Sequence, residues 1–501
     1  MTLSPAQLAG RLLMVDIAGE RLEADEAEFL RRHHIGAVCL FRRNVGDFDT
    51  TCRLLSQLRE LLGPTGLVAI DQEGGAVMRT LFMPEAPSAM ALGAADDEAL
   101  AYRIGEAVGR GLAALGINWN LAPVLDLNCN PHNPVIAERS FGADPERAAR
   151  LAGAWLDGHL AAGVATCVKH FPGHGDTQVD SHLTLPVVDK PREALERYEL
   201  APFRLLSGRT PGLMSAHIVF PAFDPVHPAT LAPALLDELL RQQWGYQGVV
   251  ITDGMNMKAI HDRYGQAEGT VLALAAGADL SLVLQYRDEM AASHAAIVAA
   301  IEQGRLDPQR LLESARRLDQ LATRFPLGGA AYPSAAQEAD RALMAEGWRR
   351  GLTAYRQPPR LPVGSRLRLV VQAEAASDGV SEAGLKPARL IELLQPHYQL
   401  DVVSFARREA LDWAGLPHDG VFTVLASTTR ARYGERERQS WRPDLHLALW
   451  NPYAAADLDA PALVSYGFAP PALAAVVDWL SGRLDASGRA PAPLTEAAEP
   501  A

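Results

Sequence analysis

The segment KHFPGHGDTQVDSH, residues 169–182, brings together side chains that can move protons or hold a ligand. It begins with Lys169 and His170 and ends with Asp180 and His182. Residues two apart in an extended segment share a face, which places Asp180 beside His182. A carboxylate beside an imidazole fixes the tautomer of the ring and raises its basicity, so this pair suits acid/base catalysis.

Two other kinds of site use similar residues. A metal site would need His170, His174, Asp180 and His182 to converge on one ion. The His-x-His pair at a first-strand end that is expected of metal-dependent amidohydrolase barrels is absent from the sequence. A phosphate loop would end in Gly-Lys followed by Ser or Thr at a helix start, which this segment does not. We therefore expect no metal and no cofactor, and favour acid/base chemistry.

Further along the chain, a carboxylate follows each of two apolar runs. Asp71 opens DQEGG, residues 71–75, and Asp253 lies within GVVITDGMNMKAI, residues 248–260. A buried carboxylate needs hydrogen-bond donors, and sugar hydroxyls are suitable ones, although Asp71 could instead cap a helix. Asp253 could attack an anomeric carbon, since retaining glycosidases use a nucleophilic carboxylate with a separate acid/base.

Arg139 lies in a loop, NPVIAERSFGADP, residues 133–145. Its guanidinium is a rigid fork of donors for carboxylate, amide or hydroxyl acceptors. The alternative is an ion pair with Glu138, Asp144 or another loop carboxylate. The residue alone does not decide between a ligand contact and a structural pair.

Eight short apolar runs must position these residues, and amphipathic helical stretches such as 96–116 and 144–163 separate them. The runs are residues 12–19, 35–41, 67–75, 117–127, 164–173, 212–220, 248–255 and 279–284. This alternation predicts a (β/α)8 TIM-like barrel, in which the chemistry lies at the C-terminal ends of the strands. Five of the predicted strand ends carry polar residues, namely Asp71, Asp126, Lys169 with His170, His217 and Asp253.

The second part of the chain predicts a smaller α/β domain after a helix at 334–352 and a Pro-rich stretch at 357–365. Its strand-like runs are 367–375, 400–406, 421–428, 445–451 and 462–467, and a helix at 471–482 follows. We expect four regions: a catalytic barrel at 1–330, a helical linker and junction at 331–365, a C-terminal α/β domain at 366–490, and a disordered tail at 491–501.

Composition limits the partners and the compartment. A net charge of −13 argues against a surface built to neutralise nucleic-acid phosphates. No run reaches the roughly 20 apolar residues of a membrane span, and the first residues do not read as a secretion signal. The cysteines form no CxxC pair, as expected in a reduced compartment. They are Cys39, Cys52, Cys129 and Cys167. We expect a cytoplasmic protein, and the sequence leaves its oligomeric state open.

Taken together, six segments resemble glycoside hydrolase family 3, in its β-N-acetylglucosaminidase branch. They are LFRRN (40–44), DQEGG, NPVIAERSFG, KHFPGHGDTQVDSH, SAHIVFPAFD (215–224) and VVITDGMNMKAI. The resemblance covers about residues 5–330, and the C-terminal part is similar to the αβα sandwich of two-domain members.

The resemblance implies retaining hydrolysis of terminal, non-reducing N-acetyl-β-D-glucosaminides. Asp253 matches the nucleophile that forms a glycosyl-enzyme, His182 matches the acid/base, and Asp180 matches its dyad partner. The positions that match sugar-binding residues are Asp71, Arg79, Arg139, Lys169 and His170. The implied substrate is a small carbohydrate, a GlcNAc-containing muropeptide or chito-oligosaccharide released during peptidoglycan recycling.

Two departures from the family pattern stand close to these residues. Gly254 follows the nucleophile where the family often has Asp, which changes the charge near Asp253. Ala137 precedes the Glu-Arg pair where the family often has Gly. Neither departure removes a catalytic group.

Four alternatives stay open. A phosphorylase is a close variant, because a neutral histidine acid/base repels phosphate less than a carboxylate does. A β-glucosidase of the same fold normally takes a carboxylate acid/base from elsewhere. A metal-dependent amidohydrolase and an inactive sugar-binding protein are the others. Residues 367–501 show no motif that would supply active-site groups, so we expect them to be structural or to shape the cleft.

Overall fold

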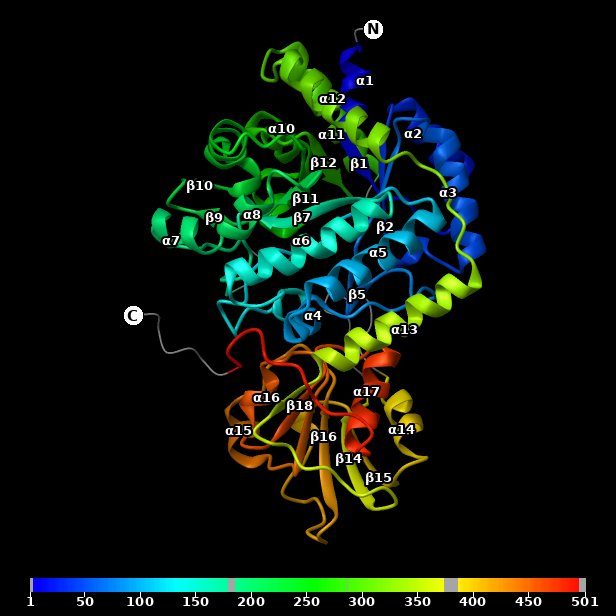
Figure 1. The fold of residues 1–501 in the computed structure, drawn as a ribbon. Helices are drawn as coiled ribbons and strands as arrows, with labels where there is room; N and C mark the ends of the chain where they lie inside the picture. The colour runs from blue at the N-terminus through cyan, green and yellow to red at the C-terminus, as the bar shows by residue number, and fades with distance from the viewer. Residues whose placement is uncertain (1–2, 179–184, 286, 374–385, 495–501) are drawn as a thin grey trace.

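The computed structural model describes residues 3–178, 185–285, 287–373 and 386–494. Figure 1 shows a larger N-terminal unit of strands and surrounding helices, and below it a smaller unit built around one sheet. Helix α13 (Ser334–Gly351) runs between the two units. Asp180 and His182 lie outside the described residues.

Eight strands of the N-terminal unit close into a barrel. They are β1 (Leu13–Val15), β2 (Ala37–Leu40), β3 (Leu67–Ile70), β6 (Trp119–Asn120), β7 (Ala165–Phe171), β8 (Gly212–Ser215), β11 (Val249–Gly254) and β12 (Leu280–Val283). Their order around the barrel is β1-β12-β11-β8-β7-β6-β3-β2, and every neighbouring pair is parallel. Parallel strands covered by helices are buried on both faces, so they read as apolar runs. Each of the eight predicted runs contains one of these strands, and the predicted TIM-like barrel is confirmed.

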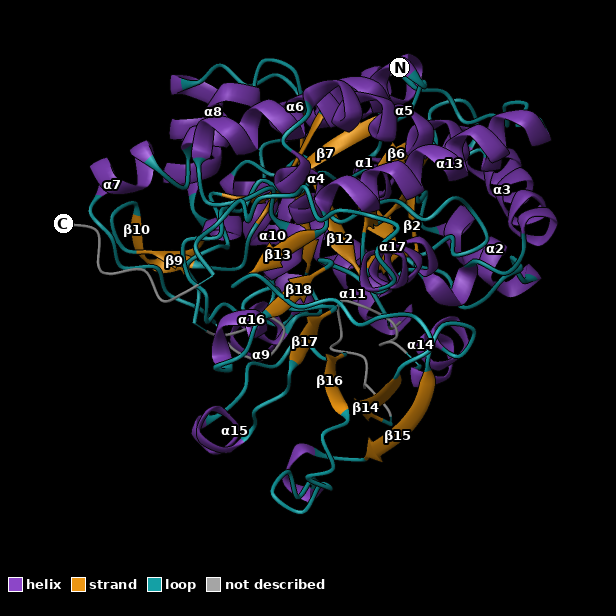
Figure 2. Ribbon diagram, turned by 60° about the horizontal axis from the view of Figure 1, so that its bottom comes forward, coloured by secondary structure: helices purple, strands orange, loops and turns teal. Residues whose placement is uncertain are grey.

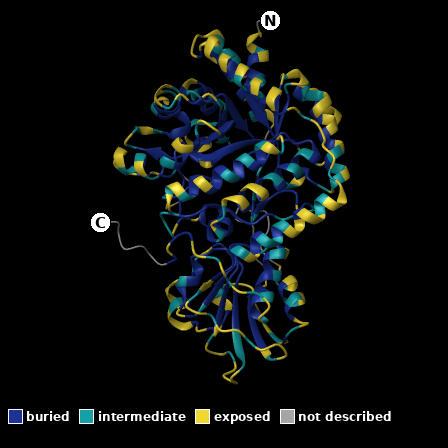
Figure 3. Ribbon diagram, viewed as in Figure 1, coloured by how far each residue is buried: buried dark blue, intermediate teal, exposed yellow. Residues whose placement is uncertain are grey.

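Helices cover the outside of the barrel and bury their apolar faces against it (Figure 3). Those before the linker are α1 (Pro5–Arg11), α2 (Ala24–Arg32), α3 (Phe48–Leu62), α4 (Ala89–Ala95), α5 (Glu98–Leu115), α6 (Pro145–Ala161), α7 (Arg192–Arg197), α8 (Ala201–Leu206), the π-helix η4 (Ala234–Gln243), α9 (Lys258–Tyr264), α10 (Gln266–Ala276), α11 (Arg287–Glu302) and α12 (Pro308–Arg324). Helices α5 and α6 pack closely because Gly105 has no side chain. A Cβ at that position would lie 2.1 Å from the Trp155 carbonyl oxygen. Within the described ranges, no helix is long and apolar enough to cross a membrane.

Two short antiparallel ribbons follow barrel strands at their C-terminal ends. The ribbon of β4 (Gln72–Gly74) and β5 (Val77–Met78) directly follows β3. The second ribbon joins β9 (Val219–Phe220) to β10 (Asp224–Pro228) after β8. Short 3-10 turns η1 (Arg42–Asn44) and η2 (Ala137–Arg139) lie in the loops after β2 and β6.

The C-terminal unit is a six-stranded sheet with helices on both faces (Figure 2). Its strands are β13 (Thr353–Tyr355), β14 (Arg366–Gln372), β15 (Gln399–Phe405), β16 (Phe422–Ser427), β17 (Leu445–Ala448) and β18 (Ala462–Val464), in the order β13-β18-β17-β16-β14-β15. Helices α14 (Pro387–Leu394) and α17 (Pro470–Leu480) pack on one face, while α15 (Glu435–Ser440) and α16 (Ala454–Asp457) lie on the other. The predicted αβα sandwich is confirmed.

Two segments of this half differ from the sequence-based expectation. Strand β13 lies inside 331–365, which was expected to be only a linker and junction, and it pairs antiparallel with β18 at the sheet edge. Residues 491–494 were predicted to belong to a disordered tail, but Ala492 and Leu494 are buried. They join an apolar cluster between the two units, because alanine and leucine in a Pro-rich tail still gain from burial.

Candidate active site

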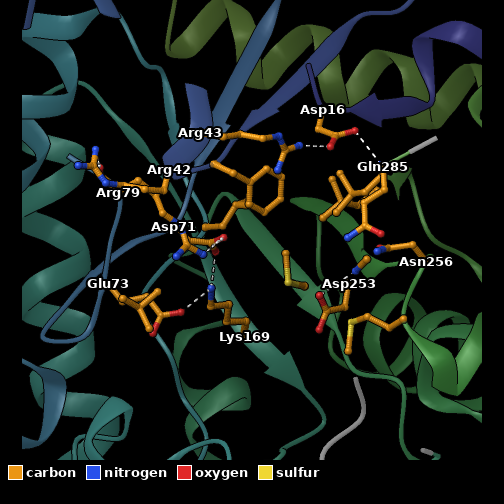
Figure 4. Close-up of a pocket in the computed structure, with 18 of the residues that line it drawn as sticks. Asp16, Arg42, Arg43, Asp71, Glu73, Arg79, Lys169, Asp253, Asn256 and Gln285 are labelled. Carbon is orange, nitrogen blue, oxygen red and sulfur yellow. Dashed lines mark hydrogen bonds and ion pairs between the residues drawn. The ribbon is translucent and has the colours of Figure 1, made fainter. Parts of the chain in front are cut away.

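A cavity of about 790 Å³ opens at the C-terminal end of the barrel strands. Asp16 follows β1, Asp71 follows β3, Lys169 lies near the end of β7, and Asp253 lies near the end of β11 (Figure 4). The polar residues that line it are Asp16, Glu20, Arg42, Arg43, Asp71, Glu73, Arg79, Arg139, Lys169, His170, His174, Asp253, Asn256 and Gln285. Side chains from segments far apart in the sequence therefore face one volume.

Charges of alternating sign line one wall of this cavity. The Lys169 Nζ lies 2.7 Å from Asp71 Oδ1 and 2.7 Å from Glu73 Oε1. Arg79 Nη2 lies 3.3 Å from Asp71 Oδ2 at one end of the array. At the other end, Arg139 donates from Nε and Nη2 to the two oxygens of Glu73, each at 2.8 Å. We call these five residues the charge array.

The array keeps its members ionised despite burial. Burial alone would raise the pKa of Asp71, but Lys169 and Arg79 outweigh it and lower that pKa. Burial is likewise the largest effect on Glu73, and Arg139 and Lys169 overcome it to hold its pKa well below the ordinary range. Burial would lower the pKa of Lys169, yet the two carboxylates raise it. At neutral pH the wall offers fixed ammonium and guanidinium donors beside carboxylate acceptors, which suits a ligand rich in hydroxyl groups.

The β4–β5 ribbon explains how DQEGG delivers two of these groups. Gly74 has a φ of +104°, and a Cβ there would lie 2.3 Å from the Pro87 carbonyl oxygen, so glycine is required. The Gln72 side chain accepts from the Arg79 backbone N–H at 2.9 Å and donates to Thr80 Oγ1 at 2.8 Å. These contacts close the ribbon and hold the Arg79 side chain near the end of β3.

His170 is oriented by Asp126. Its Nδ1 lies 2.6 Å from Asp126 Oδ2, and the other carboxylate oxygen accepts the His174 backbone N–H at 2.6 Å. Burial opposes ionisation of Asp126, but the neighbouring histidines lower its pKa. An Nδ1–H donated to this carboxylate leaves Nε2 as the nitrogen available to a ligand. Burial lowers the pKa of His174 to about 4, and its Nδ1 lies 2.8 Å from Thr177 Oγ1.

Asp253 lines the cavity near the end of β11, and its Oδ1 accepts the Gly254 backbone N–H at 2.7 Å. His217, which follows β8, has its Nε2 3.0 Å from the Gly254 carbonyl oxygen and so holds the strand end in place. A Cβ on Gly254 would lie 2.8 Å from Asn256 Oδ1. The space beside the strand end is therefore taken by a neutral amide, where the family pattern often has a carboxylate.

The structure brings six of the eight predicted site residues to one cavity. They are Asp71, Arg79, Arg139, Lys169, His170 and Asp253. The predicted dyad of Asp180 and His182 falls in the undescribed segment between Gln178 and Leu185, so its geometry stays a prediction.

Two further residues belong to the site and were not among the predicted ones. Asp126, at a predicted strand end, orients His170. Glu73 joins Lys169 to Arg139 in the charge array, so Arg139 pairs with a carboxylate 66 positions away in the sequence. The sequence did hold a signal for Glu73, because Asp71 and Glu73 are two apart in an extended ribbon and so share a face.

A closed barrel of parallel strands, with a carboxylate and a fixed array of charged donors and acceptors at its mouth, defines a TIM-barrel enzyme for polar, hydroxylated substrates. Residues 7–321 match the Glycosyl hydrolase family 3 N terminal domain, and the chain belongs to this family. The prediction that it is a glycoside hydrolase related to the β-N-acetylglucosaminidase branch is confirmed by the relatives described next.

Two curated relatives and one solved structure carry related names. The chain is 36% identical over 308 residues to a Beta-hexosaminidase of Pseudomonas aeruginosa (strain LESB58). The matched stretch covers 61% of this chain and 90% of that protein. It is 33% identical over 374 residues to Beta-hexosaminidase A of Pseudoalteromonas piscicida, covering 66% of this chain but only 62% of that protein. A glycoside hydrolase family 3 beta-N-acetylglucosaminidase from Paenibacillus sp. str. FPU-7 superposes with a TM-score of 0.91 at 34% identity, covering 99% of this chain and 100% of that one.

Proposed function

We propose that this chain is a retaining exo-β-N-acetylglucosaminidase that removes terminal, non-reducing N-acetyl-β-D-glucosamine from small carbohydrates. The observation that carries the proposal is that Asp253 shares one cavity with the charge array. A nucleophile needs the sugar held in place beside it, and the array supplies that hold. The names of the relatives support the choice of sugar.

In the first step, an oxygen of Asp253 attacks the anomeric carbon while the bond to the aglycone oxygen breaks. His182, in its protonated form, gives that oxygen its proton, so the aglycone leaves as an alcohol. In the second step, neutral His182 removes a proton from water, and the resulting oxygen attacks the anomeric carbon and releases Asp253. Asp180 orients the imidazole in both steps.

The remaining site residues bind the sugar. Asp71 accepts hydrogen bonds from ring hydroxyls, while Lys169 and Arg139 donate to hydroxyl oxygens of the same ring. His170, oriented by Asp126, adds a contact through Nε2. Arg79 holds the Asp71 carboxylate in place. The 2-acetamido group is not required as a nucleophile, because Asp253 fills that role.

The natural substrate in this proposal is a GlcNAc-containing muropeptide or a chito-oligosaccharide, handled in the cytoplasm during peptidoglycan recycling. The cavity volume of about 790 Å³ falls within the usual range for small-molecule sites. All four cysteines are free thiols, in agreement with a reducing compartment.

A β-N-acetylglucosaminide phosphorylase is the second candidate. The observation that favours it is that Arg42 and Arg43 line the same cavity as Asp253 and are cations that could attract phosphate. In that reaction phosphate, in place of water, would attack the glycosyl-enzyme and give GlcNAc-1-phosphate.

Turnover of 4-nitrophenyl N-acetyl-β-D-glucosaminide with and without inorganic phosphate tests the proposal. We expect free GlcNAc as the product in both cases, and GlcNAc-1-phosphate as the main product would establish the phosphorylase instead. The corresponding β-glucoside is the control substrate. A faster rate on the glucoside than on the N-acetylglucosaminide would overturn the choice of sugar.

A further inference from the structure

The loop between β6 and α6 carries part of the substrate site. It includes η2, and its residues Val135 and Arg139 line the cavity. Arg139 is also the residue that fixes Glu73 in the charge array. Whatever holds this loop therefore sets the position of the array.

The C-terminal unit holds the loop through hydrogen bonds from a buried arginine. Arg430 Nη1 donates to the Val135 carbonyl oxygen at 2.6 Å, and Nη2 donates to Glu138 Oε1 at 2.6 Å. The Trp450 indole N–H donates to the same Glu138 oxygen at 2.9 Å. Glu138 is 0% exposed and Arg430 is 7% exposed, so this contact is shielded from solvent. The stability of a buried charge pair depends strongly on its geometry, because only well-placed partners offset the cost of removing both charges from water.

One carbonyl oxygen links the Arg430 contact to the substrate site. The Val135 oxygen accepts from Arg430 of the C-terminal unit and, at 3.3 Å, from Arg139 Nη1 of the barrel. A shift of the loop that lengthens the first bond must also move the acceptor of the second.

Two further points of the loop are tied to the same unit. Arg432 Nη1 donates to the Pro131 carbonyl oxygen at 3.0 Å, and Arg432 is itself held by Asp457. At the other end, the Ala143 backbone N–H donates to the Pro491 carbonyl oxygen at 3.1 Å. The second half of the loop, from Pro131 to Ala143, is thus held at several points by residues after position 429.

We propose that Arg430 is a positioning residue for substrate binding, so that the C-terminal domain completes the barrel's sugar site without touching the sugar. Arg430 holds Val135 and Glu138, which fixes η2 and keeps Arg139 aligned with Glu73. The inference rests on the proposed function only in taking Arg139 as a sugar contact. It gives the second domain a part in binding that the sequence did not indicate.

The test replaces Arg430 with methionine, which keeps the length of the side chain and removes both donors. Its matched control is Arg368→Met, because Arg368 is 2% exposed and pairs with Asp401 and Asp419 inside the C-terminal unit. Both variants lose a buried arginine that donates to carboxylate and backbone carbonyl oxygens, but of the two only Arg430 contacts the barrel loop.

Three quantities are measured for each protein: kcat and KM with 4-nitrophenyl N-acetyl-β-D-glucosaminide, the affinity for free GlcNAc by calorimetry, and the thermal unfolding midpoint. We expect Arg430→Met to lower GlcNAc affinity and kcat/KM tenfold or more, with a smaller change in kcat. Arg430→Lys should recover part of the affinity, because it keeps the charge but not the two-armed contact. Arg368→Met should lower the unfolding midpoint and leave affinity and KM within twofold of the wild type.

Equal GlcNAc affinity and KM in Arg430→Met and the wild type would overturn the inference. If Arg430→Met does not fold, Trp450→Phe serves instead, since it removes the indole N–H given to Glu138 and part of the ring that Arg430 packs against, while Arg430 itself is kept. Trp450→Phe should lower GlcNAc affinity two- to fivefold. Wild-type affinity in this variant would contradict the role proposed for the Arg430–Glu138 contact. Wild-type turnover of the N-acetylglucosaminide is measured first and decides the proposed function separately, so the two failures are distinct.

Discussion

Replacing Lys169 with methionine would remove the cation between the two carboxylates of the charge array while nearly preserving the side-chain volume. Lys169 contacts Asp71 and Glu73 at 2.7 Å each and is 3% exposed. The variant would leave the two carboxylates with Arg79 and Arg139 as their remaining cationic partners in the array. Removing one partner of a buried ion pair is costly. We expect losses of both stability and sugar affinity.

The magnitude follows from what remains in the array. Removing one partner of a buried ion pair costs about 3–5 kcal/mol when nothing replaces it. Here each carboxylate keeps an arginine, so we expect the lower end, about 3 kcal/mol in the free energy of unfolding. A loss of Lys169 donation to a sugar hydroxyl, taken as about 1.5–3 kcal/mol for a charged hydrogen bond, corresponds to roughly tenfold or more in KM.

The difference in stability between the two proteins depends on pH, with a sign set by the carboxylates. In the wild type the pKa values of Asp71 and Glu73 are held below their ordinary values. Such groups contribute stability above their unfolded pKa of about 4, and that stability is lost as pH falls through the folded pKa. Without Lys169 both folded pKa values rise. The gap between variant and wild type is therefore largest at neutral pH and narrows in acid, where the carboxylates are protonated in both proteins.

The assay is urea unfolding followed by tryptophan fluorescence at several pH values, together with KM for 4-nitrophenyl N-acetyl-β-D-glucosaminide. Arg241→Met is the matched control. Arg241 pairs with the buried Asp279, which directly precedes β12. It also donates to the Tyr246 and Gly248 carbonyl oxygens, just before β11, at 2.7 Å each. It should lose stability while keeping the wild-type KM. A Lys169→Met protein with wild-type KM, or with a stability gap that grows in acid, would refute the reasoning about the array.

Two further predictions concern the segment that leads into the undescribed residues. His182→Ala should lower kcat by roughly 10²–10⁴-fold, the usual contribution of a general acid/base, and the loss should be smaller for a 4-nitrophenyl leaving group than for a chito-oligosaccharide. Gly175→Ala should lower stability by about 1–3 kcal/mol and slow turnover, because its Cβ would lie 1.8 Å from a backbone oxygen. Its control, Gly208→Ala, has nothing within 4 Å of the added Cβ and should behave as the wild type in thermal unfolding and turnover.

Each of these predictions has an outcome that contradicts it. Equal kcat loss with both leaving groups would argue that His182 does not protonate the aglycone oxygen. An equal unfolding midpoint for the Gly175 and Gly208 variants would mean that the backbone after β7 adjusts without cost.

Much of the barrel could be predicted from the sequence, because its strands are buried on both faces and read as continuous apolar runs. The two-residue strand β5 and the three-residue strand β13 could not, since so few residues give no period. The tail was misjudged for a different reason. Ala492 and Leu494 are buried in an apolar cluster with residues of α4, α13 and the C-terminal sheet, which no local pattern indicates.

The site was predictable where a functional group ends a strand, as Asp71, Lys169 and Asp253 do. It was not predictable where the function of a residue lies in its pairing. Arg139 and Glu73 are 66 positions apart, and their ion pair forms because the fold brings the loop that carries Arg139 beside the β4–β5 ribbon.

The most direct test of the central claim is to trap the covalent intermediate with a 2-acetamido-2-deoxy-5-fluoro glycoside and locate the label by peptide mass spectrometry. We expect a label on Asp253, formed with loss of the aglycone, and no label in Asp253→Ala. A label on any other residue would contradict the assignment of the nucleophile.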